Sequence, residues 1–248
     1  MNFKYLLYDL KCNIIEQHSF NANTFDKLAD IVNECITNYT FRKIERSKLL
    51  AICISIPAVI ETNGGKRIIS STVLGIKDDD NATLELSELF PSVPIIIGNQ
   101  SIFCAYAEKE FGNLKNSRNL FYLNIDEGVG AGIILDGKMY KGSEGMAGEF
   151  GHMSFDVNGI PCDCGNRGCF ERYISIPAII ERFSQGALKK GQQPAASIEE
   201  VAVAYANHDA VAIETMHEIA SILSYGLSNI INLLNFDNVV LGGNIQIL

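Results

Sequence analysis

The chain has 248 residues, of which 47% are hydrophobic and 20% are charged, and its formal net charge is −9 at pH 7. This composition is typical of a soluble globular protein of one or two domains. The negative charge argues against nucleic-acid binding by this chain alone, because such surfaces are usually basic. No apolar stretch is long and uninterrupted enough to span a bilayer, and no signal peptide opens the chain. We therefore expect a cytoplasmic protein with no membrane partner.

Strands and helices alternate in the predicted N-terminal half. A β-hairpin is expected from residues 3–10 and 14–20, followed by a helix from Thr24 to Tyr39. The continuous apolar run 49–57 predicts a strand that is buried on both faces. A short strand at 95–97 and a helix at 101–111 complete this half.

The polar segment 113–119 is the expected hinge between a smaller domain of residues 1–117 and a larger domain of residues 118–248. Strands are expected at 120–125 and 132–135, joined by a glycine-rich turn. Helices are expected to begin at Ser175 and at Ser197, where Ser-Ile-Glu-Glu forms a capping box. A helix at 209–236 and a strand at 239–241 follow. This order predicts a two-domain α/β architecture.

One segment, residues 145–171, concentrates the chemistry of the chain. It holds His152, Cys162, Cys164 and Cys169, and three thiolates with one imidazole form a complete tetrahedral ligand set for Zn²⁺. Glycines between them allow the tight turns that would bring the ligands together. Because no further ligand is evident, we expect a structural zinc site. The alternative is four unrelated buried side chains.

Two carboxylates, Glu149 and Glu171, bracket this segment. If the zinc-bound loop holds them rigidly, they can accept hydrogen bonds from neighbouring hydroxyl groups, as a sugar site requires. Taken alone, they could equally be two solvated surface acids.

GxxGExGH followed by CxCGxxGCxE resembles the signature of the ROK family (repressor, ORF, kinase), and the similarity covers nearly the whole chain. The family comprises sugar kinases and sugar-responsive repressors with the actin-like, hexokinase-like fold (ribonuclease H-like), in which two domains flank a cleft. The resemblance implies that His152 and the three Cys bind zinc. It also implies that Glu149, His152 and Glu171 contact sugar hydroxyls, with His152 serving both through its two ring nitrogens.

The position of the family's general base is altered. Family members usually carry Asn-Asp where this chain has Asn99-Gln100. The resemblance implies that Asn99 binds a sugar hydroxyl. Gln100 has no useful basicity, so no catalytic residue is expected there, although its amide can still contact a hydroxyl. The alternative is that Gln100 is merely a helix-start residue.

Three alternating glycines, Gly128, Gly130 and Gly132, resemble the family's second phosphate loop, although GxGxG is also typical of a tight hairpin. Asp126-Glu127 replace the usual Gly-Thr there. Unit charges about 4 Å apart repel by about 4 kcal/mol at an effective dielectric of about 20, so these acids oppose a triphosphate. Gly242 and Gly243 match the adenosine-side glycines. The first phosphate loop and the closing C-terminal helices are missing, so both ends look truncated relative to the family.

Retained sugar and zinc residues beside altered kinase elements predict the effector-binding body of a ROK transcriptional regulator, a repressor without kinase activity. Its expected partners are a sugar effector, further copies in a dimer or tetramer, and DNA through a helix-turn-helix region that this chain lacks. One alternative is a sugar kinase using ATP and Mg²⁺ whose missing segments lie outside this chain. Another is a non-functional remnant that keeps only the zinc-stapled core.

Overall fold

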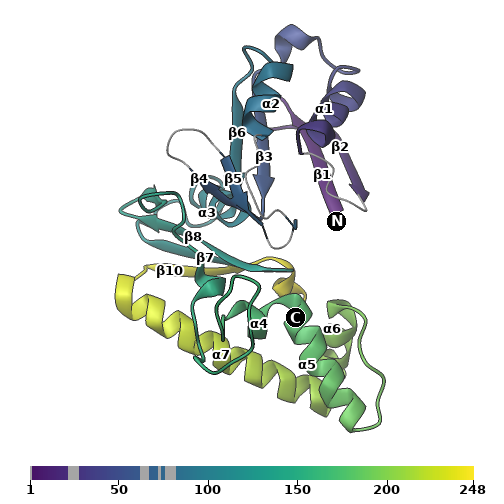
Figure 1. Ribbon diagram of the computed structural model, residues 1–248, viewed down its shortest axis with the longest axis vertical. Coiled ribbons are helices and arrows are strands. Elements are labelled where there is room, and N and C mark those ends of the chain that lie inside the picture. The colour runs from purple at the N-terminus through teal and green to yellow at the C-terminus, as the bar shows by residue number, and fades with distance from the viewer. Residues whose placement is uncertain (1, 22–27, 62–66, 72–73, 76–81) are drawn as a thin grey trace. The chain divides into compact units, whose positions relative to one another are not determined.

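The computed structural model divides into two compact units, unit 1 (Met1–Asn99) and unit 2 (Gln100–Leu248) (Figure 1). The described residues are 2–21, 28–61, 67–71, 74–75 and 82–248. The sequence predicts a domain boundary after residue 117, whereas the compact units divide after Asn99. Helix α3 (Gln100–Glu110) belongs to unit 2 because it packs on two strands of that unit.

In its described residues, unit 1 combines short strands with two α-helices. Its elements are β1 (Asn2–Tyr8), β2 (Ile14–Asn21), α1 (Leu28–Cys35), a π-helical turn (Ile36–Thr40), a 3₁₀ turn (Arg46–Lys48), β3 (Ile52–Ile56), β4 (Val59–Glu61), β5 (Arg67–Ser70), α2 (Ala82–Leu89) and β6 (Ile95–Asn99). Within the described residues the strands pair as β1–β2 and β4–β5, both antiparallel, and as β3–β6, parallel. The helix expected from Thr24 is described only from Leu28, because residues 22–27 lie outside the described part.

The predicted N-terminal hairpin is confirmed. The rings of Phe3 and Phe20 stack across its strands with centroids 5.6 Å apart. In the turn, the Asp9 carboxylate accepts hydrogen bonds from the backbone N–H groups of Lys11 (2.8 Å) and Asn13 (2.9 Å). A short acidic side chain thus closes the turn locally, which is why the sequence pattern sufficed to place it.

Strand β3 is buried on one face only. Its three isoleucines are buried in the core of unit 1, whereas Cys53 and Ser55 are exposed. The prediction of a strand buried on both faces is therefore wrong. The apolar run 49–57 does not distinguish the two cases, because Cys is apolar yet lies on the outer face at position 53.

Unit 2 is built on one sheet with helices on both sides. Besides α3, its elements are β7 (Leu120–Ile125), β8 (Val129–Leu135), β9 (Lys138–Tyr140), a 3₁₀ turn (Phe150–His152), α4 (Glu171–Ile174), α5 (Ile176–Lys189), α6 (Ile198–Ala206), α7 (Ala210–Leu234), β10 (Asn238–Gly242) and a final 3₁₀ turn (Asn244–Ile247). The strand order is β10-β7-β8-β9, with β10 parallel to β7 and the other pairs antiparallel. Figure 1 shows α3 on one side of this sheet and α4, α5 and α7 on the other. Every residue of β7 is buried between them.

The helix starts predicted at Ser175 and Ser197 are confirmed, and Asp209 adds a third cap that the sequence analysis did not predict. Ser175 and Ser197 cap α5 and α6 through their side-chain oxygens. The Asp209 carboxylate caps α7 by accepting hydrogen bonds from the N–H groups of Val211 (2.8 Å) and Ala212 (3.0 Å). These caps satisfy N–H groups that the first turn of a helix leaves without intrahelical partners.

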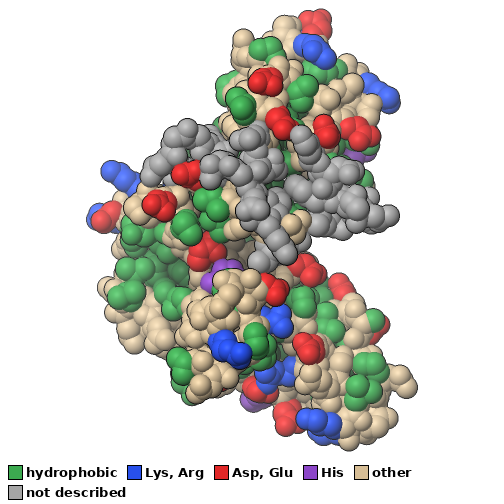
Figure 2. Space-filling model, in the orientation of Figure 1, with side chains coloured by type: hydrophobic (Ala, Val, Ile, Leu, Met, Phe, Trp, Pro, Cys, Tyr) green, Lys and Arg blue, Asp and Glu red, His purple; other side chains and the backbone are tan. Residues whose placement is uncertain are grey.

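The surface agrees with the composition of the chain. Figure 2 shows acidic side chains spread over the described part of the visible face, with basic side chains scattered among them, as a net charge of −9 leads one to expect. Among the described helices, none has both the length and the apolar character needed to cross a membrane.

Candidate metal centre and flanking carboxylates

The four predicted metal ligands come together in unit 2. His152 ends the 3₁₀ turn that follows Glu149, and the three Cys lie in the loop that leads into α4. Their ligand atoms all lie within 4.8 Å of one another. The Nδ1 atom of His152 is 3.8 Å from Sγ of Cys162, and Sγ of Cys164 is 3.7 Å from Sγ of Cys169. The four donors thus form a compact cluster.

The loop that carries the three Cys is closed by short-range backbone hydrogen bonds and by Gly165 and Gly168, which both have positive φ. The N–H of Cys162 donates to the carbonyl of Asn166, and the N–H of Gly165 donates back to the carbonyl of Cys162, both at 2.9 Å. Gly168 has φ +66°, and a Cβ on it would lie 1.8 Å from the carbonyl oxygen of Asp156. Only glycine permits this close approach.

Two phenylalanines anchor the ends of this segment in the core. Phe150 and Phe170 are each 2% exposed, and their rings stack with centroids 5.1 Å apart. Gly226 on α7 leaves room for both rings, since a Cβ there would lie 2.6 Å from one and 2.9 Å from the other. The residues near His152 and Cys169 are therefore held in place by packing against α7.

The donor spacing fits a four-coordinate metal ion. A zinc–sulfur bond of about 2.3 Å implies sulfur–sulfur edges of about 3.8 Å in a tetrahedron, close to the 3.7 Å separation of Cys164 and Cys169. Burial is the main cause that raises the pKa of the Cys169 thiol to about 12, and burial also raises that of Cys162. A bound cation would reverse this preference and displace the protons. The cluster could hold a metal ion.

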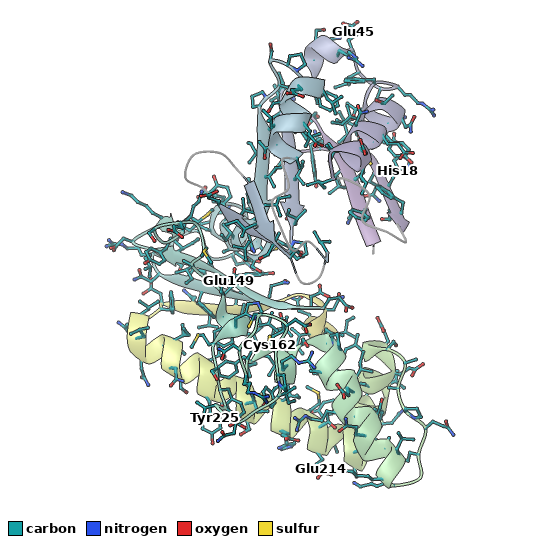
Figure 3. All side chains as sticks on the ribbon, viewed as in Figure 1. His18, Glu45, Glu149, Cys162, Glu214 and Tyr225 are labelled. Carbon is teal, nitrogen blue, oxygen red and sulfur yellow. The ribbon has the colours of Figure 1, made fainter. Side chains whose placement is uncertain are left out.

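Glu149 supplies a carboxylate beside the cluster. It is only partly exposed, and its side chain makes no hydrogen bond within the described part of the chain. Burial raises its pKa, and the nearby charge of Glu171 adds to this, while His152 acts in the opposite direction. Figure 3 places the labelled Glu149 next to the β7–β8 hairpin and the labelled Cys162 in the loop near α4. A partly buried carboxylate without a donor is suited to accept hydrogen bonds from a ligand.

Glu171, by contrast, is already fixed at one oxygen. It opens α4, and its Oε2 accepts a hydrogen bond from the backbone N–H of Val129 at 2.9 Å. Sequence reasoning missed this contact, because a backbone N–H leaves no signal in the sequence. The bond ties α4 to the start of β8 and holds the second carboxylate in place beside the first.

Asn99 is the last residue of unit 1 and Gln100 is the first residue of unit 2 along the chain. Asn99 ends β6 in unit 1, where its side-chain amide donates to the carbonyl of Ala58 at 3.0 Å. Gln100 is the first residue of α3 in unit 2. The roles of both residues as sugar contacts stay predictions from the sequence.

The three glycines of the expected phosphate loop do not lie together in one loop. The turn between β7 and β8 comprises only residues 126–128, so Gly128 alone belongs to it, whereas Gly130 and Gly132 lie inside β8. The carbonyl of Gly128 accepts a hydrogen bond from the N–H of Asp126 at 2.9 Å, which closes the turn. Gly128 thus has the tight-hairpin role that the sequence left open as the alternative. Contact of Gly128 with a nucleotide stays a prediction from the sequence.

Close packing of α3 explains the other two glycines. On alternate positions of β8, Val129, Ala131 and Ile133 face the core. Gly130 and Gly132 face α3 instead, where a Cβ on Gly132 would lie 2.4 Å from the carbonyl oxygen of Ser101. A side chain at Gly132 would push the helix away from the strand, whereas one at Gly130 would meet the Ser101 hydroxyl at 2.8 Å.

The other face of β8 is approached just as closely by the segment that holds Glu149. A Cβ on Gly148 would lie 2.2 Å from the carbonyl oxygen of Ala131, and one on Gly151 would lie 2.1 Å from that of Val129. The motif GxxGExGH contains both glycines, so their spacing was the available signal for this contact.

Packing also accounts for the predicted adenosine-side glycines. A Cβ on Gly242 would lie 1.8 Å from the hydroxyl oxygen of Tyr122, and one on Gly243 would lie 2.3 Å from the carbonyl oxygen of Ile125. Close by, the side chain of Asn244 donates to the Asp126 carboxylate at 2.9 Å. These residues join β10 to the β7–β8 turn.

Comparisons with known proteins identify the lineage of the chain. The ROK family model matches residues 1–247. The xylose repressor of Bacillus spizizenii is 32% identical over 243 residues, which cover 97% of this chain and 61% of the repressor. A glucokinase of Halalkalibacterium halodurans is 29% identical over 211 residues, which cover 81% of this chain and 63% of the glucokinase. The chain thus spans about three-fifths of the length of these relatives.

Solved structures confirm the fold class. A ROK family transcriptional regulator described as a homologue of Escherichia coli Mlc matches 99% of this chain and 63% of its own, with a TM-score of 0.83 and 25% identity. A ROK family glucokinase from Streptomyces griseus, in complex with glucose and AMPPNP, matches over 99% of this chain and 80% of the glucokinase chain, with a TM-score of 0.84 and 19% identity. The α/β fold is the actin-like, hexokinase-like fold expected from the sequence, and the chain belongs to the ROK family.

Proposed function

We propose that this chain is the sugar-binding part of a ROK transcriptional regulator, a repressor that lacks kinase activity. Its similarity to the Bacillus spizizenii xylose repressor extends over 97% of this chain, whereas that to the Halalkalibacterium halodurans glucokinase extends over 81%. DNA binding would require a helix-turn-helix region outside this chain. Assembly into a dimer or tetramer is part of the same proposal.

The sugar is held by carboxylates in unit 2. The observation that carries this proposal is the partly buried Glu149 carboxylate, which no donor among the described residues reaches, beside a Glu171 fixed by Val129. Two neighbouring carboxylates can accept hydrogen bonds from vicinal hydroxyls, and the fixed Glu171 loses little side-chain entropy on binding. Asn99 and Gln100 supply further contacts in this proposal.

The Cys₃His cluster holds a structural zinc ion. In this arrangement His152 coordinates through Nδ1, the nitrogen 3.8 Å from Sγ of Cys162, which leaves Nε2 for a sugar hydroxyl. The metal fixes the loop between Glu149 and Glu171, so it stabilises the spacing of the two carboxylates.

Two residues favour a sensor over a kinase. Gln100 cannot take the proton from an attacking hydroxyl. The Asp126 carboxylate is held by Asn244 at the hairpin turn, where it would repel nucleotide phosphates. Both features concern the phosphate chemistry and leave Glu149, His152 and Glu171 unaffected.

Calorimetric titration with xylose, glucose and N-acetylglucosamine tests the proposal, with xylose first because of the relatives' name. We expect binding of at least one sugar. Glu149→Gln should weaken it by about 10- to 100-fold, since a hydrogen bond to a charged group contributes about 1.5–3 kcal/mol. Glu214→Gln, an exposed substitution of the same kind on α7, is the matched control and should bind normally. Failure of all three sugars to bind would remove the proposal.

A sugar kinase using ATP and Mg²⁺ remains the second candidate, because glucokinases are among the relatives and the matched Streptomyces structure contains AMPPNP. A coupled assay for sugar-dependent ADP formation separates the two. We expect no turnover. Sugar-dependent turnover that survives Gln100→Ala would establish a kinase with a different base, and its loss in Glu149→Ala would show that it uses the same sugar site.

A further inference from the structure

One buried tyrosine holds the loop that leads into Cys162. The hydroxyl oxygen of Tyr173, on α4, accepts a hydrogen bond from the backbone N–H of Ile160 at 3.0 Å. The carbonyl of Ile160 in turn accepts a hydrogen bond from the N–H of Gly168 at 2.8 Å. Both backbone polar groups of Ile160 are therefore hydrogen-bonded: its N–H to Tyr173, and its carbonyl to Gly168, the residue before Cys169.

The neighbouring backbone packs directly against the same hydroxyl. A Cβ on Gly159 would lie 2.2 Å from the Tyr173 hydroxyl oxygen. The Tyr173 ring is 8% exposed and meets the ring of Phe155 edge to face, with centroids 5.2 Å apart. Because the ring is packed on α4, its hydroxyl cannot follow a movement of the loop.

We infer that Tyr173 is a positioning residue for the metal centre. Its hydroxyl sets where the backbone at 159–160 can lie, and through it the place of Cys162 relative to His152 and Cys169. This inference rests on the proposed metal binding. Partners outside the ligand set typically change metal affinity by about 10- to 100-fold when they are lost.

The first test is the affinity for Zn²⁺, measured by competition with a chromophoric chelator. Tyr173→Phe keeps the ring and removes only the acceptor for Ile160, so we expect about tenfold weaker binding. Tyr225→Phe is the matched control, because this ring also stacks near Phe155 but is 60% exposed. Cobalt-substituted protein should show altered thiolate bands in Tyr173→Phe alone. Equal zinc affinity in Tyr173→Phe and the wild type would overturn the inference.

The second test is a double-mutant cycle between Gly159 and Tyr173. In the wild type, Gly159→Ala forces a methyl group onto the hydroxyl. In Tyr173→Phe that oxygen is gone, and the nearest remaining atoms, from Asp156 and Gly168, lie 3.0 Å away. The loss of zinc affinity caused by Gly159→Ala should therefore be smaller in the Tyr173→Phe background. Strictly additive losses would overturn the inference alone, whereas a wild type that binds no zinc would overturn the metal proposal as well.

Discussion

Replacing Gly132 with alanine should destabilise unit 2, because no space exists for a methyl group between β8 and α3. The new Cβ would lie 2.4 Å from the carbonyl oxygen of Ser101 and 2.5 Å from Cβ of Ala105. Carbon atoms pack best at about 3.5–4.0 Å, so α3 must move by about 1 Å. Overpacking of this kind costs about 1–3 kcal/mol. Because Ala105 is fully buried, we expect about 2–3 kcal/mol.

Thermal unfolding followed by circular dichroism measures this effect. A loss of that size should lower Tm by about 4–12 °C in a unit of this length. Gly191→Ala is the control, since Gly191 has φ +72° with no atom within 4 Å of its Cβ, so alanine there costs only backbone strain of about 1 kcal/mol. If Gly132→Ala lowers Tm no more than Gly191→Ala does, Gly132 is not a packing glycine.

Three further outcomes follow from single contacts. Elemental analysis should find about one zinc per chain, and Cys164→Ser should release it and destabilise unit 2, because structural metal binding contributes to folding free energy; retained metal would contradict the ligand set. Asp209→Ala should cost about 1 kcal/mol in urea unfolding, because α7 loses its N-cap; an unchanged midpoint would refute this. Backbone N–H groups of Asn119 and Arg118 lower the pKa of Asp237. Its stabilisation is therefore present above its unfolded pKa of about 3.9 and is lost as pH falls through the folded pKa. Asp237→Asn should thus reduce stability at pH 7 but not in strong acid, and equal losses at both would contradict the linkage.

Features with local causes could be predicted from the sequence. The candidate metal ligands were identifiable because Cys162, Cys164 and Cys169 lie within eight residues, with Gly165 and Gly168 permitting tight turns between the last two. The helix starts at Ser175 and Ser197 were identifiable because a cap and the N–H groups it satisfies lie within one turn of each other. In both cases the interacting groups are sequence neighbours.

Features that depend on distant backbone atoms could not be predicted. The hydrogen bond from the Val129 N–H to Glu171 joins residues 42 positions apart, and any residue other than proline offers the same N–H. Gly130 and Gly132 resemble a phosphate loop, yet they lie in a strand against α3, because glycine serves close packing and ligand approach equally well. The one-sided burial of β3 depends on which distant elements pack on each face of the strand. The apolar run does not show that the face with Cys53 is left exposed.

The central claim is that the Glu149 and Glu171 carboxylates, beside the Cys₃His cluster, accept hydrogen bonds from sugar hydroxyls. Calorimetric titration of the wild type and of Glu149→Gln with the same sugar tests it most directly. The account predicts saturable binding by the wild type and about 10- to 100-fold weaker binding by the variant. Identical affinities in the two proteins would contradict it.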